Sequence, residues 1–374
     1  MNRERGSKTG VWDRRTFLER TSGAIGGLLT LPAVSLPPFA DPSLPRHWAW
    51  VHGGRERTGE EWRERFRVAR RAGIGGVLVA GGENPLLADA AGTTGLAFHR
   101  WIWTLNRGGD RWVVEHHPEW FSVSRRGDSS LTDPPYVGYY QWLCPTRPEV
   151  REYLAGAFAA VAADPLVAGV HLDYVRHPDV ILPVGLWEKY GLVQETELPE
   201  YDFCYCEVCR RTFQKRTGID PLGLPDPPAD ERWRRFRWEG VTRVVEAIAT
   251  AVHALGKPVT AAVFPTPTIA RRLVRQAWED WPLDGVMPML YHRFYEEEIE
   301  WIGRSAREGV QALSGRRPLQ AGLYVPDLDP SGLEEAVRTA RSAGAAGVAL
   351  FELDALRPAH WERLGSALSG AWGD

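Results

Sequence analysis

The stretch PEVREYLAGAFAAVAADPLVAGVHLDY, residues 148–174, contains the pattern that decides the fold. Its first part, residues 148–163, opens with Pro and Glu and spaces its apolar residues like one face of a helix. Its second part, residues 167–174, is a short and almost continuously apolar run. Such a run is typical of a strand whose two faces are both covered. The stretch therefore predicts one helix followed by one buried strand.

The same unit recurs along the chain from about Arg46 onward. Strand-like apolar runs alternate with amphipathic segments, of which residues 58–72 begin with the capped start Thr58–Glu61. Eight such runs predict a (β/α)8 TIM barrel over residues 46–374. A doubly wound open sheet is the alternative, but no Gly-x-Gly-x-x-Gly follows the first run. The runs are residues 47–53, 75–81, 97–105, 167–174, 258–264, 285–291, 319–325 and 347–353, and the further helical segments are residues 230–255, 296–308, 331–343 and 358–368.

The amino-acid composition indicates which classes of ligand the protein can bind. The 374 residues are 44% apolar and 25% charged, with a formal net charge of -3, which is typical of a globular protein and excludes a disordered or collagen-like chain. Near-neutral charge without a long basic stripe argues against nucleic acid. The 17 tryptophans favour stacking on a ligand, and sugars are the ligand class that aromatic faces suit. The sequence specifies no oligomeric state.

Residues 1–40 predict an export signal rather than part of the barrel. Residues 13–19 contain the pair Arg14–Arg15 and resemble the twin-arginine export consensus. The weakly apolar residues 22–36 that follow are too short and too rich in glycine to span a membrane. We therefore expect a periplasmic or extracellular protein without a stable membrane span. Retention of the segment as an N-terminal anchor and a plain basic N-terminus are the alternatives.

The resemblance to a known group lies in residues 169–178, GVHLDYVRHP. This segment resembles the fourth-strand signature Gly-x-x-x-Asp-Tyr-x-Arg-x-Pro of the family-10-like glycosyl hydrolases, a barrel group loosely related to the amylase superfamily. The resemblance implies a barrel enzyme that hydrolyses glycosidic bonds, with the catalytic carboxyl group on Asp173. Arg176 is expected to hold that carboxyl group ionised. A structural role for Asp173, as a salt-bridge or capping residue, is the alternative.

Glycoside hydrolysis usually needs a second carboxyl group, and several acids follow predicted strands. We favour Glu352, at the end of the last apolar run, as proton donor, with Asp173 as nucleophile or base. The other candidates for the second acid are Asp354, Asp327 and Glu83. Residues 107–146 and 177–228 are long loops after strands three and four, where barrel enzymes build their sites. The predicted substrate-binding residues are Trp50, His52, Trp103, Trp142, Tyr174, Arg176, Tyr291, His292 and Asp327.

The four cysteines form a second motif. Residues 204–209, CYCEVC, supply Cys204, Cys206 and Cys209, and Cys144 lies in the earlier segment Cys-Pro-Thr-Arg-Pro. Four thiolates satisfy a closed tetrahedral zinc site. The pattern resembles the structural zinc cluster of glycoside hydrolase family 42, whose catalytic glutamate motifs are not visible in this chain. Two disulfides are the alternative, because exported proteins with an even number of cysteines usually oxidise them.

Together these features predict an exported glycoside hydrolase that acts on an oligo- or polysaccharide, carries a structural zinc and needs no organic cofactor. A non-catalytic carbohydrate-binding barrel is the main alternative. A metal-dependent amidohydrolase is weaker, because the first predicted strand has no His-x-His.

Overall fold

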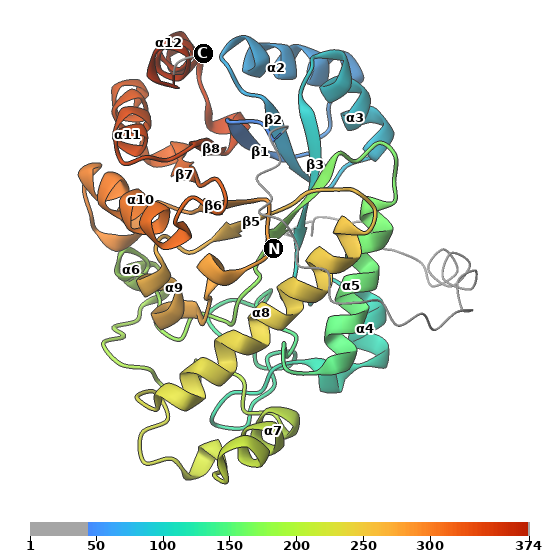
Figure 1. The fold of residues 1–374 in the computed structure, drawn as a ribbon, viewed down its shortest axis with the longest axis vertical. Coiled ribbons are helices and arrows are strands. Elements are labelled where there is room, and N and C mark those ends of the chain that lie inside the picture. The colour runs from blue at the N-terminus through green and yellow to red at the C-terminus, as the bar shows by residue number, and fades with distance from the viewer. Residues whose placement is uncertain (1–43, 373–374) are drawn as a thin grey trace, which may run out of the picture.

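The computed structural model describes residues 44–372, and the predicted export signal lies outside these residues. Eight parallel strands alternate with helices, which confirms the (β/α)8 TIM barrel (Figure 1). All eight predicted runs contain a strand. The strands are β1 (Trp48–His52), β2 (Gly76–Ala80), β3 (Ala97–Trp103), β4 (Gly169–Asp173), β5 (Val259–Val263), β6 (Gly285–Pro288), β7 (Gln320–Tyr324) and β8 (Gly347–Phe351).

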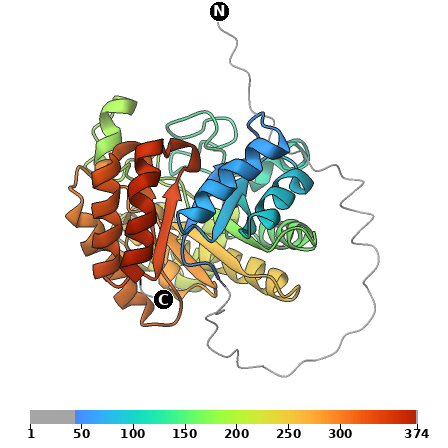
Figure 2. The same ribbon diagram turned by 90° about the horizontal axis from the view of Figure 1, so that it is seen from above.

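The strand order follows the chain and the sheet closes on itself, which excludes the open doubly wound sheet. β8 pairs with β1, so the first and the last strand of the chain are neighbours in the sheet. β6 and β7 meet through two bridges, Val286 with Leu319 and Met289 with Gly322. The backbone N–H of Leu290 also donates to the carbonyl oxygen of Gly322 at 2.9 Å. Figure 2 shows the helices arranged around the strands.

The predicted helical segments are confirmed, including the capping box, in which Thr58 and Glu61 hydrogen-bond each other's backbone N–H. The periodicity of the sequence did not predict α3, α4, α6 and α9, which are short helices of 10, 6, 4 and 8 residues. The helices are α2 (Gly59–Arg71), α3 (Asn84–Thr93), α4 (Arg111–His116), α5 (Pro148–Ala162), α6 (Trp187–Tyr190), α7 (Glu207–Thr217), α8 (Glu231–His253), α9 (Pro267–Val274), α10 (Glu300–Leu313), α11 (Pro330–Ser342) and α12 (Pro358–Trp372). No helix among the described residues combines the length and apolar character needed to cross a bilayer.

Side chains fill the barrel interior. Trp48, Trp50 and Trp101 pack there with smaller apolar residues from five strands. The indole N–H of Trp50 donates to Nε2 of His171 at 3.1 Å, and Nδ1 of His171 lies 2.9 Å from Oγ1 of Thr260. Burial holds the pKa of His171 well below its usual value, so this ring is neutral. Because the interior is packed, the mouth formed by the carboxyl ends of the strands is where a ligand can bind.

The loops after β3 and β4 form a lobe beside the mouth. They join through one isolated antiparallel bridge, Ser124 with Phe203, and through the hydrogen bond from the N–H of Tyr205 to the carbonyl oxygen of Val123 at 2.7 Å. This lobe has its own core, in which four cysteines pack with aromatic residues that include Trp233. Figure 1 shows α7 at the end of the molecule opposite α12, below the adjacent helices α5 and α8.

Candidate active site

Asp173 ends β4 at the barrel mouth, as the sequence predicts. Its Oδ2 accepts a hydrogen bond from the indole N–H of Trp101 at 2.9 Å, and its Oδ1 accepts one from the backbone N–H of Tyr174 at 2.7 Å. Tyr174 has a φ of 47°, a left-handed conformation that costs energy for a residue with a Cβ. This backbone turn and the two donors fix the orientation of the Asp173 carboxyl group.

The surroundings of the Asp173 carboxyl group differ from the expectation. Burial raises its pKa, and the hydrogen bonds from Trp101 and Tyr174 and the charge of Arg176 offset only part of that effect. Arg176 does not contact Asp173; its guanidinium donates instead to Asp179 at 2.9 Å. Arg176 therefore favours the ionised form of Asp173 only through the field of its charge, without a direct contact, and burial outweighs this effect on the pKa. A carboxyl group with a raised pKa is suited to act as a proton donor.

Arg176 itself is buried within a cage of aromatic rings. Its guanidinium carbon lies between 4.9 and 5.9 Å from the ring centroids of Trp142, Phe264, Tyr174 and Tyr140. Arg176 is 6% exposed, so its guanidinium packs between the loops after β3 and β4 and is not available to a ligand at the mouth. Its predicted role in substrate binding is not supported by this placement.

Glu352 follows β8, on the side of the barrel opposite β4. Its Oε1 lies 2.6 Å from the guanidinium of Arg55, and its Oε2 lies 3.3 Å from Nε2 of His52. The His52 ring in turn packs against Trp101 with a centroid separation of 5.1 Å. Asp173, Trp101, His52 and Glu352 thus form a continuous line of contacts across the mouth.

The other acids considered from the sequence occupy different settings. Burial favours the neutral form of Asp354, but the hydrogen bond from Arg57 and the charges of Arg65 and Arg55 outweigh it and lower the pKa of this carboxyl group. Glu83 is exposed at the start of α3. Neither replaces Glu352 in the line of contacts to Asp173.

His292 and Asp327 lie in the loops after β6 and β7, close enough for their charges to interact. Burial lowers the pKa of His292, which is 2% exposed, and partial burial raises the pKa of Asp327. Burial and then the charge of Asp173 raise the pKa of the Tyr291 phenol, so its hydroxyl stays protonated. Of these three residues, Asp327 is exposed at the mouth, whereas His292 and Tyr291 are 2% and 7% exposed and present little surface to a ligand.

The tryptophans predicted to bind substrate separate into two kinds. Trp50 and Trp142 are 1% and 0% exposed, so neither presents a face to a ligand, and their predicted binding role is not supported. Trp103 is 37% exposed and Tyr139 is 50% exposed, with ring centroids 5.9 Å apart. Trp103 is paired with Asp173 in the β3–β4 ladder. The exposed aromatic surface therefore lies directly beside the Asp173 carboxyl group.

The residues predicted from the sequence to form the site included neither Arg55 nor Trp101. The available signal for Arg55 was the triplet Arg55–Glu56–Arg57 directly after the first strand. For Trp101 it was the two-residue strand period, which places Trp101 on the same side as Trp103. In the structure, Trp101 packs inside the barrel, whereas Trp103 is exposed at its rim.

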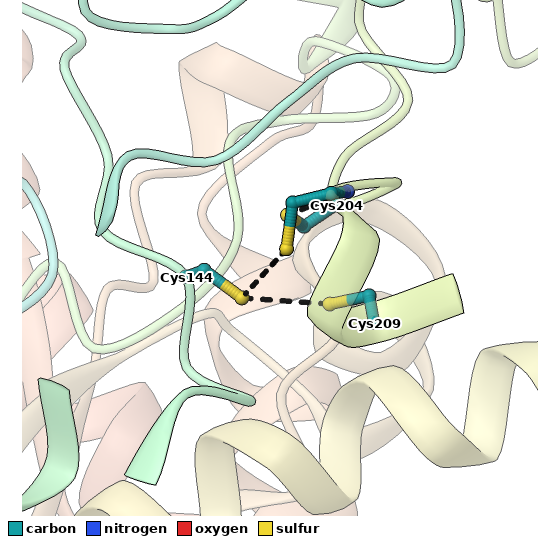
Figure 3. A group of neighbouring side chains, drawn as sticks. Cys144, Cys204 and Cys209 are labelled. Carbon is teal, nitrogen blue, oxygen red and sulfur yellow. Dashed lines mark hydrogen bonds between the residues drawn. The ribbon is translucent and has the colours of Figure 1, made fainter. Parts of the chain in front are cut away.

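The four cysteines come together in the lobe, all of them buried and free (Figure 3). The Sγ of Cys144 lies 3.4 Å from that of Cys209 and 3.6 Å from that of Cys206, and all four sulfurs lie within 4.8 Å of one another. A disulfide bond needs about 2.05 Å. Sulfurs at the corners of a zinc–thiolate tetrahedron are about 3.8 Å apart, given a Zn–S distance of about 2.3 Å. The cluster is therefore compatible with a structural metal site and does not show the alternative disulfide pairs.

No protein-family model and no curated protein matches this chain. Several solved structures share its fold. The catalytic domain of β-amylase from Paenibacillus polymyxa has a TM-score of 0.60 at 11% identity, with 87% of this chain and 98% of that chain covered. The PgaB (BpsB) glycoside hydrolase domain from Bordetella bronchiseptica has a TM-score of 0.58 at 13% identity, with coverage of 83% and 92%.

α-L-Fucosidase isoenzyme 2 from Paenibacillus thiaminolyticus has a TM-score of 0.55 at 14% identity, covering 87% of this chain and 49% of that one. At these identities the likeness extends to the fold alone. The chain thus has the TIM-barrel fold found in catalytic domains of glycoside hydrolases.

Proposed function

We propose that this protein is a glycoside hydrolase that cleaves an oligo- or polysaccharide at the mouth of its barrel. The observation that carries the proposal is the contrast between two carboxyl groups there. Asp173 is partly buried with a raised pKa, whereas Glu352 is held in an ion pair with Arg55. Hydrolysis of a glycosidic bond needs one protonated and one ionised carboxyl group. Asp173 is accordingly the proton donor and Glu352 the nucleophile or base, the reverse of the roles expected from the sequence.

The surroundings of Asp173 support a sugar as ligand. Trp103 and Tyr139 offer exposed aromatic surface beside it, and the apolar face of a sugar ring packs well against such surface. The exposed carboxyl group of Asp327, in the loop after β7, supplies a hydrogen-bonding group to the same mouth, which Tyr291 and His292 line from buried positions. A sugar stacked on Trp103 would place its glycosidic oxygen near the Asp173 carboxyl group.

The decisive experiment compares wild-type protein with Asp173→Asn on a broad glycan panel and on aryl glycosides of graded leaving-group ability. We expect the wild type to release reducing ends. Asp173→Asn should lose about 1000-fold in kcat/KM on natural glycans, or ~4 kcal/mol, but much less on activated aryl glycosides, whose leaving groups depart without protonation. Asp89→Asn, at an exposed aspartate on α3, is the control. Binding of oligosaccharides without any release of reducing ends would support the non-catalytic barrel instead.

We also propose that Cys144, Cys204, Cys206 and Cys209 hold one structural zinc ion. The metal would join the loop after β3 to the start of α7, and its chemistry would be structural because four thiolates leave no position open for a substrate. Metal analysis of purified protein should find about one zinc per chain. Protein without metal and without titratable thiols before reduction would contradict the proposal.

Export by the twin-arginine route is a further part of the proposal and rests on residues 13–19, which contain Arg14 and Arg15, and on the weakly apolar residues 22–36 that follow. A double substitution of both arginines by lysine should keep the protein in the cytoplasm, as fractionation of the producing cells would show. Unchanged export of the double variant would contradict this route.

A further inference from the structure

At the rim of the barrel, beside β1 and β8, three arginine side chains are in direct contact with only two carboxylates. Arg55, Arg57 and Arg65 converge on two carboxylates, Glu352 and Asp354. Arg55 bridges the pair, with one terminal nitrogen 2.6 Å from Glu352 and the other 3.0 Å from Asp354. Three guanidinium groups directly contact two carboxylates, so the direct ion pairs of this cluster have an excess of positive charge; the carboxylate of Glu61 interacts with Arg57 only through its charge, without a direct ion pair.

The three arginines have different surroundings. Arg57 binds Asp354 through two hydrogen bonds of 3.0 Å each, and Arg65 contacts the same carboxylate and the carbonyl oxygen of Leu353. The Asp354 side chain is only 7% exposed, so these two arginines are engaged by a nearly buried partner. The side chain of Arg55 is 43% exposed. It is therefore the arginine of this cluster that can contact a ligand.

Arg55 keeps donors for such a ligand. A guanidinium group has five N–H bonds in a planar fork, and the two contacts of Arg55 leave three of them. The fork matches the planar geometry of a carboxylate, to which it donates two parallel hydrogen bonds. The imidazole of His52 lies 3.3 Å from the other oxygen of Glu352, and 45% of its side chain is exposed, so this ring can also contact a ligand bound at Arg55.

We propose that the substrate of this site is a glycan that contains a carboxylated sugar, a uronic acid, and that Arg55 with His52 binds its carboxylate. The inference rests on the proposed function in that it places a sugar beside Glu352. A uronate carboxylate would balance the excess charge of the cluster, whereas a neutral hydroxymethyl group would leave Arg55 with water as its only further partner. Arg55 is thus a specificity-determining residue.

Binding of simple glycosides tests the proposal without turnover. The probes are methyl β-D-glucuronide and methyl β-D-galacturonide, each against its neutral glucoside or galactoside, with methyl 6-O-sulfo-β-D-glucoside as a second anion. Affinities are measured by saturation-transfer NMR titration of the full chain. Wild-type protein should bind at least one uronide about tenfold or more tightly than its neutral partner. Arg55→Gln should abolish the preference, and Arg63→Gln, an equally charge-reducing change at an exposed pair on α2, should keep it.

Equal affinity for uronides and neutral glycosides, no binding of either set, or a preference that survives Arg55→Gln would overturn the proposal. An equal gain for the sulfated glycoside would also overturn it, since that result would indicate attraction by charge alone. A uronide preference in a protein that hydrolyses no glycan would contradict the hydrolase and leave the carboxylate site standing. Hydrolysis of neutral glycans with no uronide preference would support the hydrolase and contradict the carboxylate site.

Discussion

The cysteine cluster and the barrel mouth are built in opposite ways from the same chain. The cluster takes three of its four side chains from residues 204–209, and all four sulfurs are buried in an aromatic core of their own. The mouth takes Asp173 and Glu352 from opposite strands of the barrel and leaves Trp103 and Arg55 in contact with solvent. A site encoded by local spacing can be recognised from sequence, whereas a site assembled by topology cannot be located until the fold is known.

The two regions are physically connected. Trp142 lies two residues before Cys144 and packs edge-on against Tyr174 with a centroid separation of 5.5 Å. Tyr174 donates its backbone N–H to Asp173. A shift of the segment that carries Cys144 would therefore be transmitted to the Asp173 carboxyl group through Trp142 and then Tyr174. We therefore expect the cluster to stabilise the mouth without taking part in the proposed chemistry.

The largest effect is expected at the cysteine cluster. Cys206→Ser removes one of the four proposed zinc ligands and should lower the free energy of unfolding by on the order of 5 kcal/mol, because metal binding is coupled to folding. Urea unfolding and metal analysis would measure the two quantities together. The control is Glu207→Ser on the next residue, whose exposed ion pair with Arg211 contributes little. If Cys206→Ser kept both its metal and its stability, the cluster would not be a metal site.

The next effect concerns the mouth and separates its two carboxyl groups. Glu352→Gln should lose roughly 100-fold in kcat/KM, about 2.7 kcal/mol, on natural and activated substrates alike, because an ionised nucleophile or base is needed whatever the leaving group. This uniform loss contrasts with the selective loss expected of Asp173→Asn. Glu56→Gln, at an exposed position in the loop after β1, is the control. A Glu352→Gln variant that spared activated substrates would restore to Glu352 the donor role expected from the sequence.

The contrast between the regions also explains what the sequence could predict. Every strand was found because buried parallel strands are short apolar runs, and the cysteines were found because ligand spacing is local. The sequence could not identify the acid that Arg176 contacts, because Asp173 and Asp179 are both three residues away from it in the chain. In the structure the guanidinium of Arg176 donates to Asp179. The burial of Trp50 and Trp142 depends on neighbours contributed by distant strands and loops. The number of residues between two positions in the sequence does not show whether their side chains are in contact.

A smaller effect is expected at the aromatic surface of the mouth. Trp103→Ala removes the exposed ring beside Asp173 and should raise KM about tenfold, ~1.4 kcal/mol, with kcat little changed, because stacking on a sugar contributes to ground-state and transition-state binding alike. Steady-state kinetics on the best glycan would measure both constants. Trp103→Phe should recover much of the affinity. A fall in kcat with unchanged KM would instead place Trp103 among the groups that act only in the transition state.

The smallest effect tests the raised pKa of Asp173. The indole N–H of Trp101 donates to the Asp173 carboxylate and thereby favours the ionised form, so it lowers the pKa that burial has raised. A proton donor must be protonated, so the alkaline limb of the pH profile of kcat/KM follows this pKa and should lie above the usual aspartate value of about 3.9. Trp101→Phe removes the hydrogen bond. It should move the alkaline limb to higher pH by about half a unit, ~0.7 kcal/mol.

Trp50→Phe is the matched control for this shift. Trp50 is also an indole packed inside the barrel, but its N–H donates to His171 and not to Asp173. Both substitutions therefore remove a similar volume from the same core, and only Trp101→Phe removes a donor to the proposed acid. A limb that moved equally in both variants would reflect general loosening of the mouth. A limb that moved to lower pH in Trp101→Phe would contradict the assignment of Asp173 as proton donor, because the loss of a donor to a carboxylate can only favour its protonated form.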